Sequence, residues 1–153
     1  MLVLEKVEKS YQNYHVLKGL SAEFHLGQCY LLLGDNGAGK STLLKCIAGD
    51  EKIDDGTIRV ELPEIAANPI VLQYQFFESY SFLKVQEVIR LFSQLIKKPS
   101  NVDELYEILD IATFKHTLIK NASGGQRKAL SLYLAFLINK PIVLLDEPFA
   151  DLD

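Results

Sequence analysis

Apolar and polar residues alternate along the first part of the chain, which is the pattern of strands that bury one face. The alternation covers residues 2–8 and 16–26, and residues 11–14 between them resemble a turn. Two strands joined by a short turn pair antiparallel. The sequence therefore predicts an N-terminal antiparallel β layer, which Gly27 and Gln28 close.

A continuous apolar run at residues 29–33 leads into a glycine-rich segment and then into apolar positions at helical spacing. A run without alternation is typical of a strand buried on both faces. We expect a helix over residues 41–48 that ends at Gly49, because glycine often terminates helices. Cys29 and Cys46 are expected to pack in the core of this strand–loop–helix unit.

In the middle of the chain, turn residues mark the ends of the expected strands, and the spacing of apolar residues then changes to that of a helix. Residues 54–56, Asp-Asp-Gly, predict a turn before a short strand at 57–60, and another strand is expected at 70–74. Apolar residues then recur at helical spacing over residues 85–97. A second helix is expected over residues 102–111, with acidic residues in its first turn, where they suit the helix dipole.

A further apolar helix is expected at residues 129–138, followed by a buried parallel strand at 141–145. A helical block, approximately residues 76–135, thus separates two sheet segments. The chain of 153 residues is long enough for one core and too short for two ordinary domains. We expect one domain, residues 1–153, of the α/β class.

Composition excludes several classes of partner and location. The net charge of −4 and the absence of a Lys/Arg-rich block argue against nucleic acid as a partner. No apolar run approaches the length of a membrane span, and the first six residues lack an export signal. We therefore expect a cytoplasmic protein with reduced cysteines. The three histidines show no metal-ligand spacing.

The glycine-rich segment fits the phosphate-binding pattern G-x-x-x-x-G-K-[ST]. Its glycines leave backbone N–H groups open to a polyphosphate, and Lys40 adds a charge that is expected to serve both binding and catalysis. The following helix directs its free amides at the same anion, and the Ser41 hydroxyl suits Mg²⁺. We expect the nucleotide to be bound by Gly34, Asp35, Asn36, Gly37, Ala38, Gly39, Lys40, Ser41 and Thr42.

Two carboxylates end the aliphatic run near the other end of the chain. A strand of this kind lies beside the phosphate loop in nucleotide-binding proteins of this class, so Asp146 is expected to reach Mg²⁺ through water. Glu147, one residue further, is expected to orient or deprotonate the attacking water. These two residues complete a candidate site for nucleotide hydrolysis.

A third motif identifies the family. Ser123, Gly124, Gly125 and Gln126 precede the apolar helix; alone, this tetrapeptide could be a helix N-cap and a turn. With the other two motifs at their spacings, the chain resembles the nucleotide-binding subunit of ATP-binding cassette (ABC) transporters, with Ala122 where the signature motif usually has leucine. The resemblance implies a RecA-like P-loop NTPase core, with the N-terminal antiparallel β layer and an inserted helical signature subdomain.

The resemblance also implies roles for three further residues. Tyr11 lies where the family keeps an aromatic side chain that stacks on adenine. Gln75 matches the glutamine that contacts Mg²⁺ and joins the two subdomains, with Gln73 as an alternative. Asp153 matches the terminal aspartate of the loop that crosses the dimer interface, and Ala150 replaces the usual serine of that loop.

The mechanism that the resemblance implies needs two cassettes in a head-to-tail dimer. ATP with Mg²⁺ binds the phosphate loop of one subunit, and residues 123–125 of the other close on the γ-phosphate. Binding draws the cassettes together, hydrolysis releases them, and the helical subdomain passes the motion to a membrane permease. The subunit is then peripheral at the cytoplasmic face of the membrane.

Two further departures from the family pattern concern the signature helix and the C-terminal end of the chain. Ala129 stands where the signature helix usually has a basic residue, and Tyr133-Leu134 replaces a common Ala-Arg pair. Family members continue beyond the equivalent of Asp153 to a histidine that contacts the γ-phosphate, so we expect a cassette that is incomplete at its C-terminal end. Two alternatives stay open: a soluble ABC ATPase unconnected with transport, and a nucleotide-binding fragment with little turnover.

Overall fold

The structure is a computed structural model that describes residues 1–62, 68–73 and 80–148. The chain divides into two compact units, Met1–Ile70 and Val71–Asp153. The predicted helical block falls within the second unit. A single domain spanning residues 1–153 stays a prediction.

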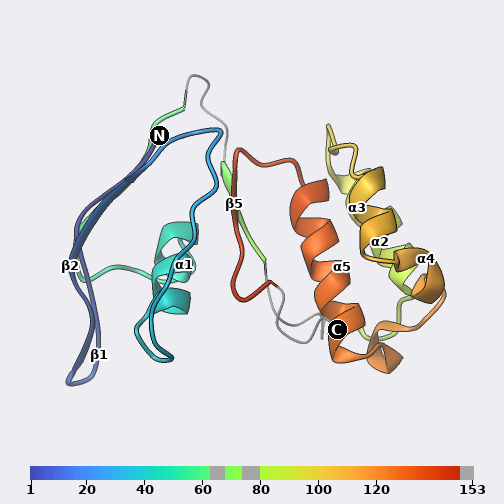
Figure 1. Ribbon diagram of the computed structural model, residues 1–153, viewed down its shortest axis with the longest axis horizontal. Helices are drawn as coiled ribbons and strands as arrows, with labels where there is room; N and C mark the ends of the chain where they lie inside the picture. The colour runs from blue at the N-terminus through green and yellow to red at the C-terminus, as the bar shows by residue number, and fades with distance from the viewer. Residues whose placement is uncertain (63–67, 74–79, 149–153) are drawn as a thin grey trace. The chain divides into compact units, whose positions relative to one another are not determined.

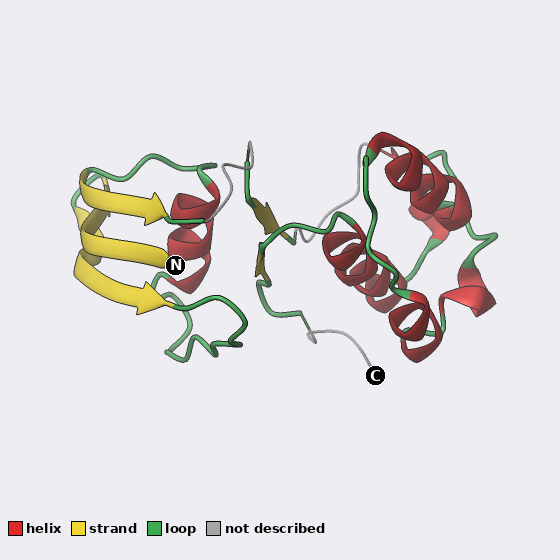
Figure 2. Ribbon diagram, turned by 90° about the horizontal axis from the view of Figure 1, so that it is seen from above, coloured by secondary structure: helices red, strands yellow, loops and turns green. Residues whose placement is uncertain are grey.

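As far as the structure describes it, the first unit is a three-stranded sheet with one helix (Figures 1 and 2). The strand order is β2-β1-β3, and both pairings are antiparallel. The predicted β layer is therefore confirmed, with strands that extend to the turn at Gln12 and Asn13. Its elements are β1 (Leu2–Tyr11), β2 (Tyr14–Phe24), α1 (Lys40–Ala48) and β3 (Asp55–Val60).

The core of the first unit forms where α1 packs against the sheet, as Figure 2 shows. Gly49 ends α1 in the left-handed conformation, φ 83°, so the predicted helix end is confirmed. Cys46 is buried in α1, as expected. The buried apolar side chains described in the first unit are Leu2, Val3, Leu4, Val7, Leu17, Leu43, Cys46 and Ile47.

The apolar run at residues 29–33 does not form the predicted strand. Cys29 is exposed rather than packed in a core, and Leu31 and Leu33 are 81% and 79% exposed. A buried parallel strand is defined by hydrogen bonds to neighbouring strands, and within the described residues no strand pairs with this segment. An apolar composition alone does not bury this segment, so the prediction for Cys29 is wrong.

The second unit combines a two-stranded sheet, order β4-β5, with a group of helices. Figures 1 and 2 show α2, α3 and α4 gathered beside α5. The elements are β4 (Ile70–Leu72), α2 (Val85–Leu95), α3 (Asp103–Ile108), α4 (Ile111–Phe114), a 3₁₀ turn (Ile119–Asn121), α5 (Gly124–Leu137) and β5 (Ile142–Leu144).

The strongly apolar character of α5 follows from its central position in this unit. Nearly all residues from Lys128 to Leu137 are buried, because other helices pack on several of its sides. The Tyr133 ring meets the Tyr106 ring of α3 edge to face, with 5.7 Å between centroids. The core cluster comprises Val85, Val88, Ile111, Phe114, Ile119, Ala129, Leu130, Tyr133, Leu134 and Leu137.

The helix predicted over residues 102–111 is two short helices, α3 and α4. Asp110 separates them with a left-handed backbone, φ 49°. Aspartate tolerates this conformation better than most residues because its side chain can bond locally. The interruption lets Ile111 and Phe114 turn into the core, where both are buried.

β5 is half-buried rather than fully buried as its composition predicted. Within the described part of the chain its hydrogen-bonded neighbour is β4, and the Gln73 N–H donates to the Leu144 carbonyl at 2.8 Å. None of the helices described is long and apolar enough to cross a membrane.

Candidate nucleotide-binding site

The Lys40 ammonium lies inside the glycine-rich loop of the first unit. Its Nζ donates to the carbonyls of Gly34 at 2.8 Å and Asp35 at 2.9 Å. The Ala38 N–H also donates to the Asp35 carbonyl, at 3.1 Å, which closes a turn within the loop. The loop is therefore wrapped around a positive charge, the arrangement that suits a polyphosphate.

Two glycines of the loop adopt backbone conformations that other residues rarely reach. Gly37 has φ 79° and Gly39 has φ 93°. A Cβ on Gly39 would lie 2.6 Å from Cγ1 of Val16 in β2, so the loop packs directly against the antiparallel layer. The layer thus fixes where α1 begins.

The N-terminus of α1 is open to an anion. Gly39 is its N-cap and supplies no side-chain hydrogen bond, so the amides of the first turn are not capped from within. The Ser41 side chain is exposed in the same turn. Free amides, a helix dipole and an ammonium group converge here, and this donor set fits the phosphates of a nucleotide with its Mg²⁺.

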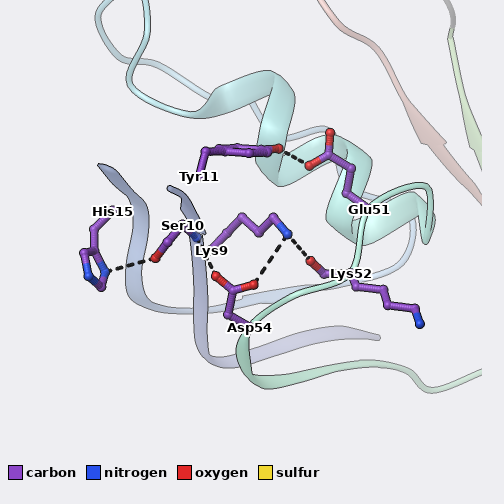
Figure 3. Close-up of polar contacts among 7 residues, drawn as sticks. All are labelled: Lys9, Ser10, Tyr11, His15, Glu51, Lys52 and Asp54. Atoms are coloured by element: carbon purple, nitrogen blue, oxygen red, sulfur yellow. Dashed lines mark hydrogen bonds and ion pairs between the residues drawn. The ribbon is translucent and has the colours of Figure 1, made fainter. Parts of the chain in front are cut away.

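Tyr11 lies at the end of β1, beside α1 (Figure 3). Its hydroxyl donates to the Glu51 carboxylate and also interacts with the Thr42 side chain. The hydrogen bond to Glu51, more than burial, raises the pKa of the Tyr11 phenol above 10.0, since ionisation would place two anions together. Tyr11 is therefore a neutral donor at physiological pH.

A polar cluster next to Tyr11 ties β1 to the segment that follows α1 (Figure 3). The Lys9 ammonium lies 5.3 Å from the centre of the Tyr11 ring and donates to the Lys52 carbonyl at 2.7 Å. Asp54 accepts from the Ser10 N–H at 2.6 Å and pairs with Lys9 at 3.5 Å. The Ser10 N–H, and secondarily Lys9, hold the pKa of Asp54 below 3.8.

The second unit carries the carboxylates and the signature motif. Asp146 is half-buried and Glu147 is exposed, just after β5. Glu147 has a left-handed backbone, φ 47°, which is strained for a residue other than glycine. The buried Lys128 ammonium donates to the Asp146 carbonyl at 3.3 Å and so ties α5 to the end of β5.

Ser123 begins α5 through a reciprocal pair of hydrogen bonds. The Gln126 N–H donates to Ser123 Oγ at 3.1 Å, and the Ser123 N–H donates to Gln126 Oε1 at 3.0 Å. This is a capping box, so Ser123 is the N-cap of α5, which is the alternative that the tetrapeptide taken alone left open. It places Gly124 and Gly125 in the first turn, and the helix begins before the predicted position at Ala129.

Replacing Ser123 by alanine is expected to destabilise the second unit by about 1 kcal/mol, because an N–H of the first turn loses its acceptor. Urea unfolding followed by circular dichroism would measure the loss. Ser123→Asp is the matched control, since aspartate caps as well as serine. Equal loss in both variants would contradict the capping role.

The structure places the predicted site residues in two groups. Tyr11 and residues 34–42 lie in the first unit, whereas residues 123–126, Asp146 and Glu147 lie in the second. Gln75 and Asp153 lie outside the described residues. The described residues hold no cluster of three or more His, Cys, Asp or Glu side chains suited to a metal ion. The predicted Mg²⁺ ligands are Ser41, Gln75 and Asp146, and this set stays a prediction.

Gln73, the alternative to Gln75, has an unusual environment. Its side chain is 4% exposed, and neither the amide nitrogen nor the amide oxygen has a hydrogen-bond partner among the described residues. An unpaired buried amide is energetically costly. The hydrogen bond from its backbone N–H to Leu144 nevertheless holds Gln73 beside β5, just beyond the end of β4.

Sequence reasoning missed two residues that contact the predicted site. Glu51 holds the Tyr11 hydroxyl, and Lys128 holds the Asp146 carbonyl. Lys128 carried little signal, because it follows Gln126 and Arg127 in the polar first turns of the helix. Glu51 carried none, since it stands in an ordinary acidic turn after a helix.

Comparison with known proteins finds matches that cover nearly the whole chain. The sequence model of the family described as ABC transporter matches residues 17–150. The sulfate/thiosulfate import ATP-binding protein CysA of Nocardia farcinica is 31% identical, over 100% of this chain and 49% of that protein. The sn-glycerol-3-phosphate import ATP-binding protein UgpC of Brucella abortus is 34% identical, over 99% of this chain and 46% of that protein. The chain thus spans about half the length of these relatives.

Solved structures show the same fold. An ATP-binding subunit of an ABC transporter matches 100% of this chain and 68% of its own length, with a TM-score of 0.81 at 24% identity. A dimeric ATP-binding cassette in a post-hydrolysis state, bound to ADP and Pi, matches 100% of this chain and 76% of its own length with a TM-score of 0.78 at 24% identity. The predicted P-loop NTPase fold is confirmed, and this chain belongs to the ABC transporter family.

Proposed function

We propose that this chain binds ATP with Mg²⁺ and hydrolyses it as the ATP-binding subunit of an ABC transporter. The observation that carries the proposal is the loop in which Lys40 Nζ is held by the Gly34 and Asp35 carbonyls at the uncapped start of α1. Family membership and the relatives that are named import ATP-binding proteins support transport as the purpose of hydrolysis.

Each residue group has a role in this proposal. The loop amides and Lys40 bind the phosphates, Tyr11 stacks on adenine, and Ser41, Gln75 and Asp146 hold Mg²⁺, the last through water. Bound Mg²⁺ would neutralise charge on the phosphates. Glu147 orients or deprotonates the attacking water, and its exposure and strained backbone are consistent with that task.

A second cassette completes the site in the proposed assembly. Residues 123–125 of one subunit approach the γ-phosphate bound by the other, and the capping box of α5 leaves N–H groups of its first turn available to an anion. Asp153 crosses the same interface. The partners are thus a second ATP-binding subunit and a membrane permease, with this chain peripheral at the cytoplasmic face.

Lys40→Ala tests the proposal. We expect ATP affinity to fall about 10- to 100-fold, because the phosphates lose a charged donor. Isothermal titration with Mg²⁺ and ATP would measure it, and Lys18→Ala is the matched control, since Lys18 is exposed in β2 of the same unit. Unchanged affinity in Lys40→Ala would refute the assignment of the loop.

A further inference from the structure

Glu51 stands just beyond the end of α1, where the chain reverses at Gly49. The N–H groups of Asp50 and Glu51 both donate to the Lys45 carbonyl, at 3.0 and 3.3 Å. These bonds satisfy a carbonyl of the last turn and fix the backbone at Glu51. The Glu51 side chain therefore starts from a rigid position.

The two oxygens of the Glu51 carboxylate have different partners. Oε1 lies 3.9 Å from the Lys45 ammonium, and Oε2 accepts from the Tyr11 hydroxyl. A carboxylate with partners on both oxygens has little rotational freedom. Charge assistance makes the hydrogen bond to the phenol stronger than a neutral one.

Tyr11 is thereby attached to the helix that follows the phosphate loop. Its hydroxyl interacts with Thr42, in the first turn of α1, as well as with Glu51. The hydroxyl is held, yet the residue remains 43% exposed, which leaves ring area for a planar base. Figure 3 shows the ring lying beside α1 with its hydroxyl directed at Glu51.

We propose that Glu51 is a positioning residue for the nucleotide base: by holding the Tyr11 hydroxyl it sets the ring that stacks on adenine at a fixed place relative to the phosphate loop. This inference rests on the proposed function. Stacking contributes most to affinity when the ring is already ordered before the ligand binds, because binding then does not have to offset the entropy lost in ordering the ring. The effect of Glu51 is therefore confined to ligands that carry a base.

The test compares ATP with inorganic tripolyphosphate, which has phosphates and no base, as ligands for the whole chain. Tyr11→Phe and Glu51→Ala each remove the hydrogen bond, and we expect each to weaken ATP binding about three- to tenfold with no change for tripolyphosphate. Tyr11→Ala removes the ring and is expected to cost about tenfold or more for ATP. Glu51→Gln keeps an acceptor and should restore most of the affinity.

A double-mutant cycle separates positioning from a general structural effect. Tyr11→Phe and Glu51→Ala remove the same hydrogen bond. The ATP affinity of the double variant should therefore be no lower than that of the single variant with the lower affinity. Glu23→Gln is the charge-matched control, since Glu23 is exposed in β2 opposite Val3, at the far end of the hairpin from Tyr11.

Two results would overturn the role of Glu51 in positioning the ring. One is normal ATP affinity in Glu51→Ala while Tyr11→Ala binds weakly, which would leave the stacking intact and remove Glu51 from it. The other is equal weakening of ATP and tripolyphosphate in Glu51→Ala, which would make Glu51 structural only. Normal ATP affinity in Tyr11→Ala would reject stacking itself, whereas failure of the proposed function would be seen separately in Lys40→Ala.

Discussion

Glu147→Gln is expected to leave ATP affinity within about twofold and to lower the rate of hydrolysis at least about a hundredfold. The glutamine amide preserves the shape of the side chain but cannot accept the proton of the attacking water. Glu147 is exposed at the end of β5, so the substitution disturbs no core packing. Phosphate release and retention of labelled ATP by the protein would be measured together, and the variant should accumulate bound, uncleaved ATP.

Glu107→Gln is the matched control for this experiment. Glu107 is exposed in α3 of the same unit, and its substitution removes the same charge away from the predicted site. It should hydrolyse ATP at the parent rate. Hydrolysis by Glu147→Gln at that same rate would show that Glu147 is not the residue that activates water.

The features that sequence predicted best are those whose cause is local. The helix α1 follows from apolar positions at helical spacing and from Gly49, whose left-handed conformation stops it. Ser123 and Gln126 stand three residues apart, so the tetrapeptide alone allowed an N-cap, although the helix was expected to begin only at Ala129. In both cases the interacting groups lie within one helical turn of each other.

Errors arose where a partner far away in the sequence decides the outcome. Residues 29–33 have the composition of a buried strand, but a strand exists only when a neighbour bonds to it. The left-handed backbone at Asp110 interrupts the predicted helix, and Ile111 and Phe114 beyond it are buried in the core. The helical spacing of the apolar residues gave no sign of this interruption. The composition of a segment shows which secondary structure it favours, and its tertiary contacts decide which structure forms.

The contacts around the candidate site were the least predictable. Tyr11 and Glu51 are separated by 40 positions, and Lys128 and Asp146 by 18. Each pair joins a motif residue to one that belongs to no motif. Motifs identify groups that meet the ligand, whereas the residues that hold those groups in place are chosen by the local geometry of this particular chain.

Gly56→Ala is expected to lower the free energy of unfolding of the first unit by about 2–5 kcal/mol. Gly56 has φ 89°, which costs other residues about 1–2 kcal/mol. A Cβ at this position would lie 2.3 Å from the Lys6 carbonyl oxygen and 2.5 Å from that of Glu5. Both atoms belong to the backbone of β1, so relief requires the β1–β3 pairing to shift, at a further cost of about 1–3 kcal/mol.

The substitution thus tests why the register between β1 and β3 changes between Glu5 and Glu8. Gly27→Ala separates the two contributions, because Gly27 has φ 74° and a Cβ added there would meet nothing within 4 Å. Thermal unfolding should show a loss in Gly56→Ala at least about 1 kcal/mol larger than in Gly27→Ala. Equal losses would mean that the backbone angle alone requires glycine at position 56, and that β1 accommodates the added side chain without loss of its pairing with β3.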